Sequence, residues 1–121
     1  MTNTRQQLGQ WGETLAAGYL TQKGYTLLDR NVRTPHGELD LVARRGAVLV
    51  FVEVKARTST VYGHPEESIT PTKQAHLLAS AAAYLQAHPD LDGDWRIDVI
   101  AIRQRKGQKP EIIHFENAVG G

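Results

Sequence analysis

Hydrophobic residues recur at helical spacing near the start of the chain, between about Gln6 and Lys23. A left-handed glycine commonly ends a helix, and Gly24 stands where such a residue would be expected. The apolar stripe consists of Leu8, Trp11, Leu15, Ala16, Tyr19 and Leu20. The pattern therefore predicts an N-terminal helix with one apolar face.

The pattern then changes to strand-like segments at residues 25–33, 38–43 and 47–56. The second segment alternates polar and apolar residues, and the third is rich in β-branched and aromatic residues. Short turns at residues 34–37 and 45–46 separate the three segments. Consecutive strands with short connections most simply form an antiparallel meander.

A second helix is predicted after a longer polar loop at residues 57–70. Thr70 and Pro71 form a typical helix start, because proline at the first helical position loses no hydrogen bond. The helical pattern ends near His88, and a fourth strand is predicted over residues 94–102.

A fifth strand, at residues 112–115, is left open by the pattern. The order α-β-β-β-α-β predicts an α/β fold, a mixed sheet flanked by helices. The 121 residues fit a single domain, 1–121, and 40% hydrophobic with 22% charged residues is an ordinary globular balance.

Composition excludes several classes of chemistry and location. The chain has no cysteine, which rules out disulfides, thiol nucleophiles and cysteine-ligated metals. The longest apolar run, residues 47–52, is far shorter than the roughly 20 residues that a membrane-spanning helix needs. Residues 1–10 lack the apolar core of a secretion signal, so we expect a cytoplasmic protein with no membrane partner.

Acidic residues and a lysine interrupt two neighbouring strands of the expected meander. Glu38 and Asp40 share one strand face, and Glu53 and Lys55 share a face of the most apolar strand. On adjacent strands, Asp40 and Glu53 can converge. Because a carboxylate in an apolar strand is costly without a partner, the pattern favours a bound cation.

Hard divalent cations such as Mg²⁺ or Mn²⁺ prefer oxygen ligands. Asp40 and Glu53 would supply two carboxylates, and the backbone carbonyl of Val54 could complete the set. Lys55 would then orient a water or stabilise charge on a phosphate. The alternative, an ordinary ion pair between Glu53 and Lys55, is left open by the residues alone.

Asp40 followed by Glu53-Val54-Lys55 resembles the PD-(D/E)XK nuclease signature. Over nearly its full length the chain resembles the YraN family, a group of uncharacterised bacterial proteins similar to Holliday junction resolvases. The resemblance is carried by Gly12-Glu13, Gly24-Tyr25, Arg30-Asn31, Gly37-Glu38-Leu39-Asp40-Leu41, Phe51-Val52-Glu53-Val54-Lys55, Arg57, Lys73 and Arg96-Ile97-Asp98-Val99-Ile100. One departure is Leu39, which stands where the signature has proline.

This resemblance implies a restriction-endonuclease-like core and a catalytic set of Asp40, Glu53 and Lys55, with Glu13 of the first helix as a further acidic member. On the helix, Glu13 lies at the edge of the apolar stripe, so it could instead face water. Some related nucleases carry a Gln-x-x-x-Tyr arrangement on the second helix. Here Leu78 occupies the tyrosine position after Gln74, so we assign that helix no catalytic role.

The charge of the chain indicates its binding partner only weakly. The net charge is +1, although residues 1–60 carry eight Lys/Arg against five Asp/Glu. Arg30 and Arg57 lie beside the family-like motifs and are our candidates for contacts with the nucleic-acid phosphates.

The leading hypothesis is a Mg²⁺- or Mn²⁺-dependent endonuclease that hydrolyses phosphodiester bonds in DNA, with branched DNA as the substrate that the resemblance to resolvases implies. The alternatives are a non-catalytic module that keeps the fold to bind nucleic acid or a protein, and a purely structural ion-pair cluster. The resemblance to resolvases allows a homodimer, on which the residues themselves give no information.

Overall fold

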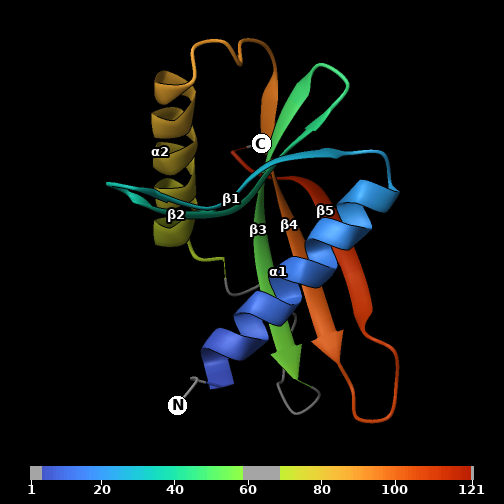
Figure 1. The fold of residues 1–121 in the computed structure, drawn as a ribbon. Coiled ribbons are helices and arrows are strands. Elements are labelled where there is room, and N and C mark those ends of the chain that lie inside the picture. The colour runs from blue at the N-terminus through green and yellow to red at the C-terminus, as the bar shows by residue number, and fades with distance from the viewer. Residues whose placement is uncertain (1–3, 59–68, 121) are drawn as a thin grey trace.

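A computed structural model describes residues 4–58 and 69–120 of the chain. Most of the polar loop expected at residues 57–70 lies outside the described residues. The elements are α1 (Thr4–Gln22), β1 (Thr26–Thr34), β2 (Gly37–Arg45), β3 (Val48–Thr58), α2 (Pro71–Ala87), β4 (Trp95–Gln104) and β5 (Glu111–Val119) (Figure 1). The α/β class is confirmed, and the fifth strand is present and longer than the pattern indicated.

The five strands form one mixed sheet in the order β1-β2-β3-β4-β5. Strands β1, β2 and β3 are the antiparallel meander expected from their short turns. Strand β4 runs parallel to β3, with α2 in the connection, and β5 returns antiparallel to β4. The parallel pair needs the long crossover, because a short turn can join only antiparallel neighbours.

The two helices cover opposite faces of the sheet (Figure 1). The core under α1 contains Ala16, Leu20, Tyr25, Leu41, Ala43, Val50, Val52, Ile100 and Ile102. The core under α2 contains Leu39, Val42, Leu49, Phe51, Leu77, Ala81, Tyr84, Ile97 and Val119. The central strands are therefore buried on both faces, which explains why residues 47–52 form a continuous apolar run.

The sheet forks between β2 and β3. Their pairing starts at the turn, where Arg45 faces Val48, and its last pair in this direction is Leu41 with Val52. Beyond that pair, β2 stays with β1 and β3 continues beside β4. The first residues past the fork are Asp40 on β2 and Glu53 on β3, so the two strands diverge at the predicted site.

Helix α2 begins as the sequence predicts. Thr70 is the N-cap, and its hydroxyl accepts a hydrogen bond from the backbone N–H of Lys73 at 3.1 Å. Pro71 follows in the first turn, and His88 caps the other end. This start fixes the first turn of α2, which carries Lys73. Neither described helix is long and apolar enough to span a membrane.

Candidate functional site

Asp40 spans the fork in the sheet. Its carboxylate Oδ2 accepts a hydrogen bond from the backbone N–H of Val54 at 2.8 Å. In a strand, the N–H and C=O of one residue point to the same side, so the carbonyl of Val54 also faces the fork. The structure thus brings Asp40 and the backbone of Val54 together, as the sequence analysis expected.

The pKa of Asp40 is raised from 3.8 to about 7. Burial is the largest cause, because it penalises the charged carboxylate. The negative charges of Glu53 and Glu13 raise the pKa further, while the Val54 N–H and the Lys73 ammonium lower it. Asp40 and Glu53 are therefore close enough to interact, as their positions at the fork require.

Three carboxylates converge at this point. Ligand oxygens of Glu13, Glu38 and Asp40 all lie within 4.8 Å of one another. Helix α1 can bring Glu13 so near because it packs closely on β3: a Cβ built on Gly12 would lie 2.9 Å from the Cβ of Ala56. The position of Glu13, which the sequence left open between the site and water, is at the site.

Arg30 holds Glu13 in place. Its Nε lies 3.7 Å from Glu13 Oε1, and its Nη2 donates to Thr14 Oγ1 at 2.9 Å and to the Gln10 carbonyl at 3.4 Å. Burial raises the pKa of Glu13, an effect that the positive charge of Arg30 opposes. Arg30 therefore already has partners on α1, and its predicted contact with nucleic acid stays a prediction.

Glu53 is buried in the middle of a charged group. Its residue is 4% exposed, and Oε1 lies 3.6 Å from Lys55 Nζ and 3.4 Å from Lys73 Nζ. The other oxygen, Oε2, is buried without a hydrogen-bond partner among the described residues. The ion pair with Lys55 is thus present, but its burial separates it from an ordinary surface pair.

Lys73 is the site residue that the sequence analysis did not assign. It belongs to α2, to which we gave no catalytic role, yet its ammonium contacts Glu53. Gln74, the residue weighed on that helix, donates from its side chain to the Ile69 carbonyl at 3.2 Å. Two features of the sequence could have pointed to Lys73 as a site residue. It lies in the first helical turn after Thr70, and it is among the residues that carry the family resemblance.

The donor set fits a hard divalent cation. Carboxylate oxygens are what such cations prefer, and the convergence of several carboxylates is costly without a positive charge between them. Glu13 Oε1 and Glu53 Oε2 are both buried without a hydrogen-bond partner among the described residues. The tightest cluster, however, joins Asp40 to Glu13 and Glu38, so it differs from the predicted pair of Asp40 and Glu53.

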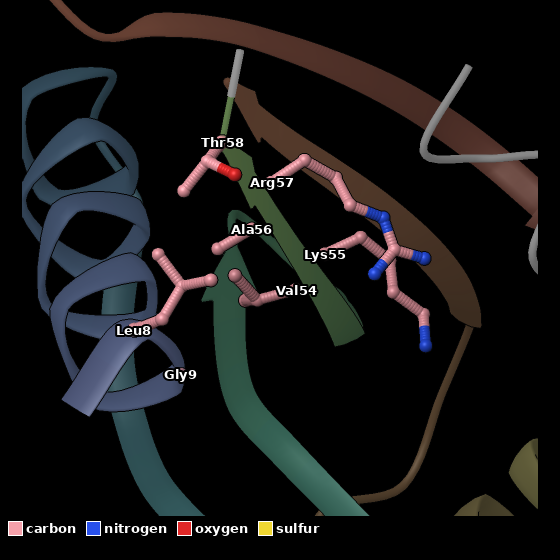
Figure 2. A pocket seen from close by; sticks show the side chains of 7 residues that line it. All are labelled: Leu8, Gly9, Val54, Lys55, Ala56, Arg57 and Thr58. Carbon is pink, nitrogen blue, oxygen red and sulfur yellow. The ribbon is translucent and has the colours of Figure 1, made fainter. Parts of the chain in front are cut away.

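Arg57 lies farther along β3, past Lys55. A hollow of about 500 Å³ between α1 and the end of β3 has both residues in its lining. Figure 2 shows the side chains of Val54 and Ala56 turned toward α1, whereas those of Lys55 and Arg57 point away from it. Arg57 is thus on the sheet face that carries Glu53, and its role as a phosphate contact stays a prediction.

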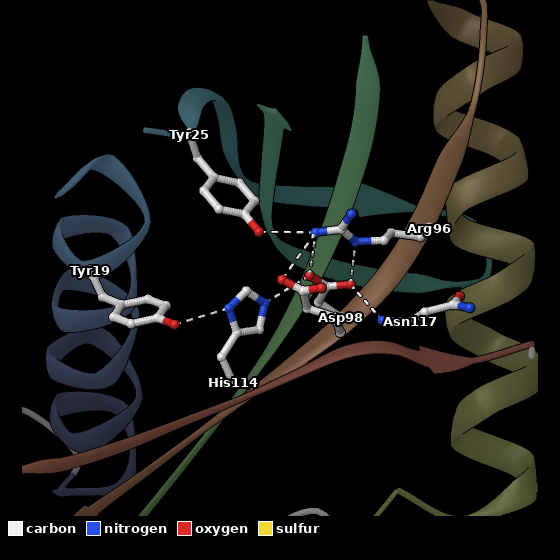
Figure 3. A network of polar contacts seen from close by, with 7 residues as sticks. Tyr19, Tyr25, Arg96, Asp98, His114 and Asn117 are labelled. Atoms are coloured by element: carbon white, nitrogen blue, oxygen red, sulfur yellow. Dashed lines mark hydrogen bonds and ion pairs between the residues drawn. The ribbon is translucent and has the colours of Figure 1, made fainter. Parts of the chain in front are cut away.

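A second buried polar group, centred on Asp98 of β4, lies between α1 and β5 (Figure 3). Asp98 is fully buried and accepts from Arg96 Nε at 3.0 Å, from the Asn117 backbone N–H at 2.9 Å, and pairs with His114 Nε2 at 2.7 Å. The Nδ1 atom of His114 lies 3.2 Å from the Tyr19 hydroxyl of α1. Arg96, two residues earlier on the same strand, is therefore one of several partners of Asp98.

These contacts determine the ionisation of Asp98. Burial alone would raise its pKa, but the hydrogen bonds from His114, Arg96 and the Asn117 N–H outweigh burial, so the pKa is lowered from 3.8. Arg96 also donates to the Tyr25 hydroxyl at 2.9 Å. The network connects β4 with β5 and with both ends of the α1–β1 connection, which gives it a structural role.

Fold and site together define a mixed α/β protein with a carboxylate cluster at a fork in its sheet. Comparison with known proteins shows that the chain matches the Uncharacterised protein family UPF0102 over residues 12–102. A UPF0102 protein of Syntrophotalea carbinolica is 50% identical over 119 residues, covering 98% of this chain and 95% of that one. One of Anaeromyxobacter dehalogenans is 46% identical over 117 residues, covering 97% and 87% of the two chains. The chain belongs to the UPF0102 family, which is the YraN group that the sequence resembles.

Proposed function

We propose that this protein is a metal-dependent endonuclease of the PD-(D/E)XK class that hydrolyses phosphodiester bonds in DNA. The observation that carries the proposal is the meeting of Asp40, Glu53 and Lys55 at the fork, with Glu53 Oε2 buried and unpartnered among the described residues. A buried carboxylate oxygen without a partner is costly, and a bound cation would remove that cost.

Asp40, Glu13 and Glu38 would hold Mg²⁺ or Mn²⁺, with Glu53 and the Val54 carbonyl facing the same fork. When bound, such an ion polarises a phosphoryl oxygen and lowers the pKa of a coordinated water. Asp40 must be ionised to serve as a ligand, so the pKa of about 7 couples ion binding to release of its proton.

Lys55 and Lys73 supply the positive charge on the other side of Glu53. Lys55 shares the strand with Glu53 and would stabilise the negative charge that develops on the phosphate. Lys73 belongs to α2, so its ammonium reaches Glu53 from a different element. With a divalent cation held by the carboxylates, the two ammonium groups would add positive charge beside it, which favours an anionic substrate.

The nature of the DNA follows from the resemblance to Holliday junction resolvases, which suggests branched DNA as the preferred substrate. A homodimer would suit a junction, because two equivalent strands are then cut. Function does not follow from fold alone, so the substrate has to be measured.

The experiment combines calorimetry with Mg²⁺ or Mn²⁺ and a cleavage assay on linear, flapped and four-way DNA. Asp40→Asn and Glu53→Gln are the test variants, and Asp90→Asn, at an exposed carboxylate after α2, is the matched control. We expect wild type and Asp90→Asn to bind the ion and cut DNA, and both site variants to lose cleavage by at least about a hundredfold. Cleavage that survives both site substitutions would overturn the assignment, and DNA affinity that is indifferent to metal, without cleavage, would favour the non-catalytic module.

A further inference from the structure

A polar hollow of about 350 Å³ opens beside the carboxylate cluster, between α1 and β1. The α1 wall is formed by Gln6, Gly9, Gln10 and Glu13. Their spacing of three, one and three residues places all four on one face of the helix. The amide side chains of Gln6 and Gln10 are exposed, so this face offers hydrogen-bond donors and acceptors to a molecule in the hollow.

The opposite wall is formed by Asn31 and Arg33 of β1 and Glu38 of β2. Asn31 has a left-handed backbone, with a φ of 55°, in the middle of the strand. Arg33 is exposed and makes no hydrogen bond or ion pair with the described residues, unlike Arg30, which is held by α1. A free guanidinium therefore stands in a hollow whose lining includes Glu13 and Glu38, two members of the carboxylate cluster.

We propose that this hollow binds the nucleotide next to the scissile phosphate, an inference that rests on the proposed nuclease function. Arg33 contacts the phosphate of that nucleotide, since guanidinium groups bind phosphate oxygens in a forked geometry. Gln6 and Gln10 contact its sugar or base edge. Glu13 and Glu38 of the same lining belong to the carboxylate cluster that would hold the cation, so the nucleotide would lie beside it.

The dimensions of the hollow favour a single nucleotide. From Gln6 to Glu13 the helix rises by roughly 10 Å, which sets the length of the hollow along α1. A volume of about 350 Å³ lies near the lower end of the range for ligand pockets, about 300–1,000 Å³. The hollow is thus large enough for one nucleotide and too small for a base pair with its backbones.

Gly9 gives the test its clearest variant. A Cβ built on Gly9 meets nothing within 4 Å, and the same holds for Gly18 on the same helix. Methionine is an unbranched residue that favours helices, so Gly9→Met and Gly18→Met should both fold and both raise the unfolding midpoint. Gly9 lines this hollow and also the hollow between α1 and the end of β3, whereas Gly18 lines neither, so a variant of Arg33, which lines this hollow alone, is needed to separate the two.

Affinity is measured by fluorescence anisotropy with fluorescein-labelled single-stranded DNA, with Ca²⁺ replacing Mg²⁺ so that the probe is not cut. We expect Gly9→Met to weaken binding by at least about tenfold, and Gly18→Met to match wild type. Arg33→Met should reduce the slope of log affinity against log salt by about 0.7, the loss of one phosphate contact on a single strand. Arg105→Met, at an exposed arginine in the β4–β5 connection, should leave the slope unchanged.

Unchanged affinity in Gly9→Met and an unchanged salt slope in Arg33→Met would overturn the inference about the hollow. That result is distinct from failure of the proposed function. If the hollow is wrong but the nuclease is right, wild type still cuts DNA and Asp40→Asn does not. If the nuclease proposal itself fails, wild type cuts none of the DNA substrates with Mg²⁺, whether or not it binds the probe, and the inference that rests on that proposal falls with it.

Discussion

The backbone N–H of Val54 donates a hydrogen bond to the Asp40 carboxylate at 2.8 Å, across the point where β2 and β3 separate. Strand pairing no longer satisfies that N–H beyond the fork, so an acidic side chain does so instead. The same bond fixes the direction of the carboxylate. The fork thus explains why the Asp40 carboxylate is held in a largely buried position and why its pKa is raised.

The stability of the metal-free protein should fall as the pH rises from about 4 to about 7. The pKa of Asp40 is raised on folding from 3.8 to about 7, so in this window the native state holds a proton that the unfolded chain has lost. The free energy of unfolding then decreases with increasing pH. The full shift corresponds to up to about 4 kcal/mol.

Urea denaturation in EDTA at about pH 5 and about pH 8 measures this loss. Asp40→Asn removes the titrating group and keeps its shape, so the variant should lose less stability between the two pH values than wild type does. Saturating Mg²⁺ should restore wild type at the higher pH, because the ion binds the ionised form. Equal losses in wild type and Asp40→Asn would contradict the assignment of the raised pKa to Asp40.

Removing the ammonium of Lys73 should raise the pKa of Asp40 further. The Nζ atom of Lys73 lies 3.4 Å from Glu53 Oε1, and its positive charge lowers the pKa of Asp40. In Lys73→Met, both carboxylates lose that charge, so ion binding at neutral pH should weaken. Carboxyl ¹³C NMR titration of Asp40 checks the shift, with Lys106→Met in the β4–β5 turn as the control. An Asp40 pKa that is the same in both variants would show that Lys73 does not act on the site.

Much of the fold could be predicted because it follows from local pattern. The apolar stripe of α1, the alternation in β2 and the Thr70-Pro71 start are each contained in a few neighbouring residues, and the helix, the strand and the helix start that they predict are confirmed. The meander follows from turn lengths alone. The length of β5 was underestimated most: a polar stretch with a left-handed residue at Asn117 obscures its strand pattern.

The site was less predictable, because it depends on how separate elements meet. The periodicity of the strand predicted that Glu38 and Asp40 share one face. It could not predict that β2 separates from β3 at that point, which brings Glu38 close to Glu13 of α1. The sequence pattern therefore placed Glu38 on the strand face of Asp40 without assigning it to the site. Lys73 was missed for the same reason, since its contact with Glu53 joins two elements separated by the crossover.

Asp98→Asn should destabilise the protein by about 3–5 kcal/mol near pH 7, because the change removes the buried negative charge that compensates the half-buried Arg96. The pKa of Asp98 is lowered on folding, so its contribution is present above pH 3.8 and is lost as the pH falls through the lower native value. The difference between wild type and variant in urea denaturation should accordingly shrink near pH 3.

Arg96→Met is the second variant that tests the structural role of the Asp98 network. It removes the donor to Asp98 and to the Tyr25 hydroxyl, and it should destabilise by a similar amount. Cleavage per folded molecule should be unchanged in both variants, because the network contributes no ligand to the carboxylate cluster. A loss of stability below about 1 kcal/mol in both would contradict the structural role of the network.

Gly12→Ala should weaken the site by moving α1 away from the sheet. The new Cβ would meet the Cβ of Ala56 at 2.9 Å and a methyl of Val54 at 3.6 Å, so the helix has to shift. Overpacking of this kind costs about 1–3 kcal/mol, and the better helix propensity of alanine returns about 1 kcal/mol. Because Glu13 is the next residue, the shift also draws its carboxylate away from Asp40.

The measurement is urea denaturation together with Mn²⁺ affinity by calorimetry, and Gly18→Ala is the control on the same helix. A Cβ at Gly18 meets open space, so that variant should gain about 0.5–1 kcal/mol and bind Mn²⁺ as wild type does. Gly12→Ala should lose stability and bind the ion several-fold more weakly. If Gly12→Ala lost stability with no change in Mn²⁺ affinity, the close packing of α1 on β3 would serve the fold alone, and Glu13 would not be a ligand.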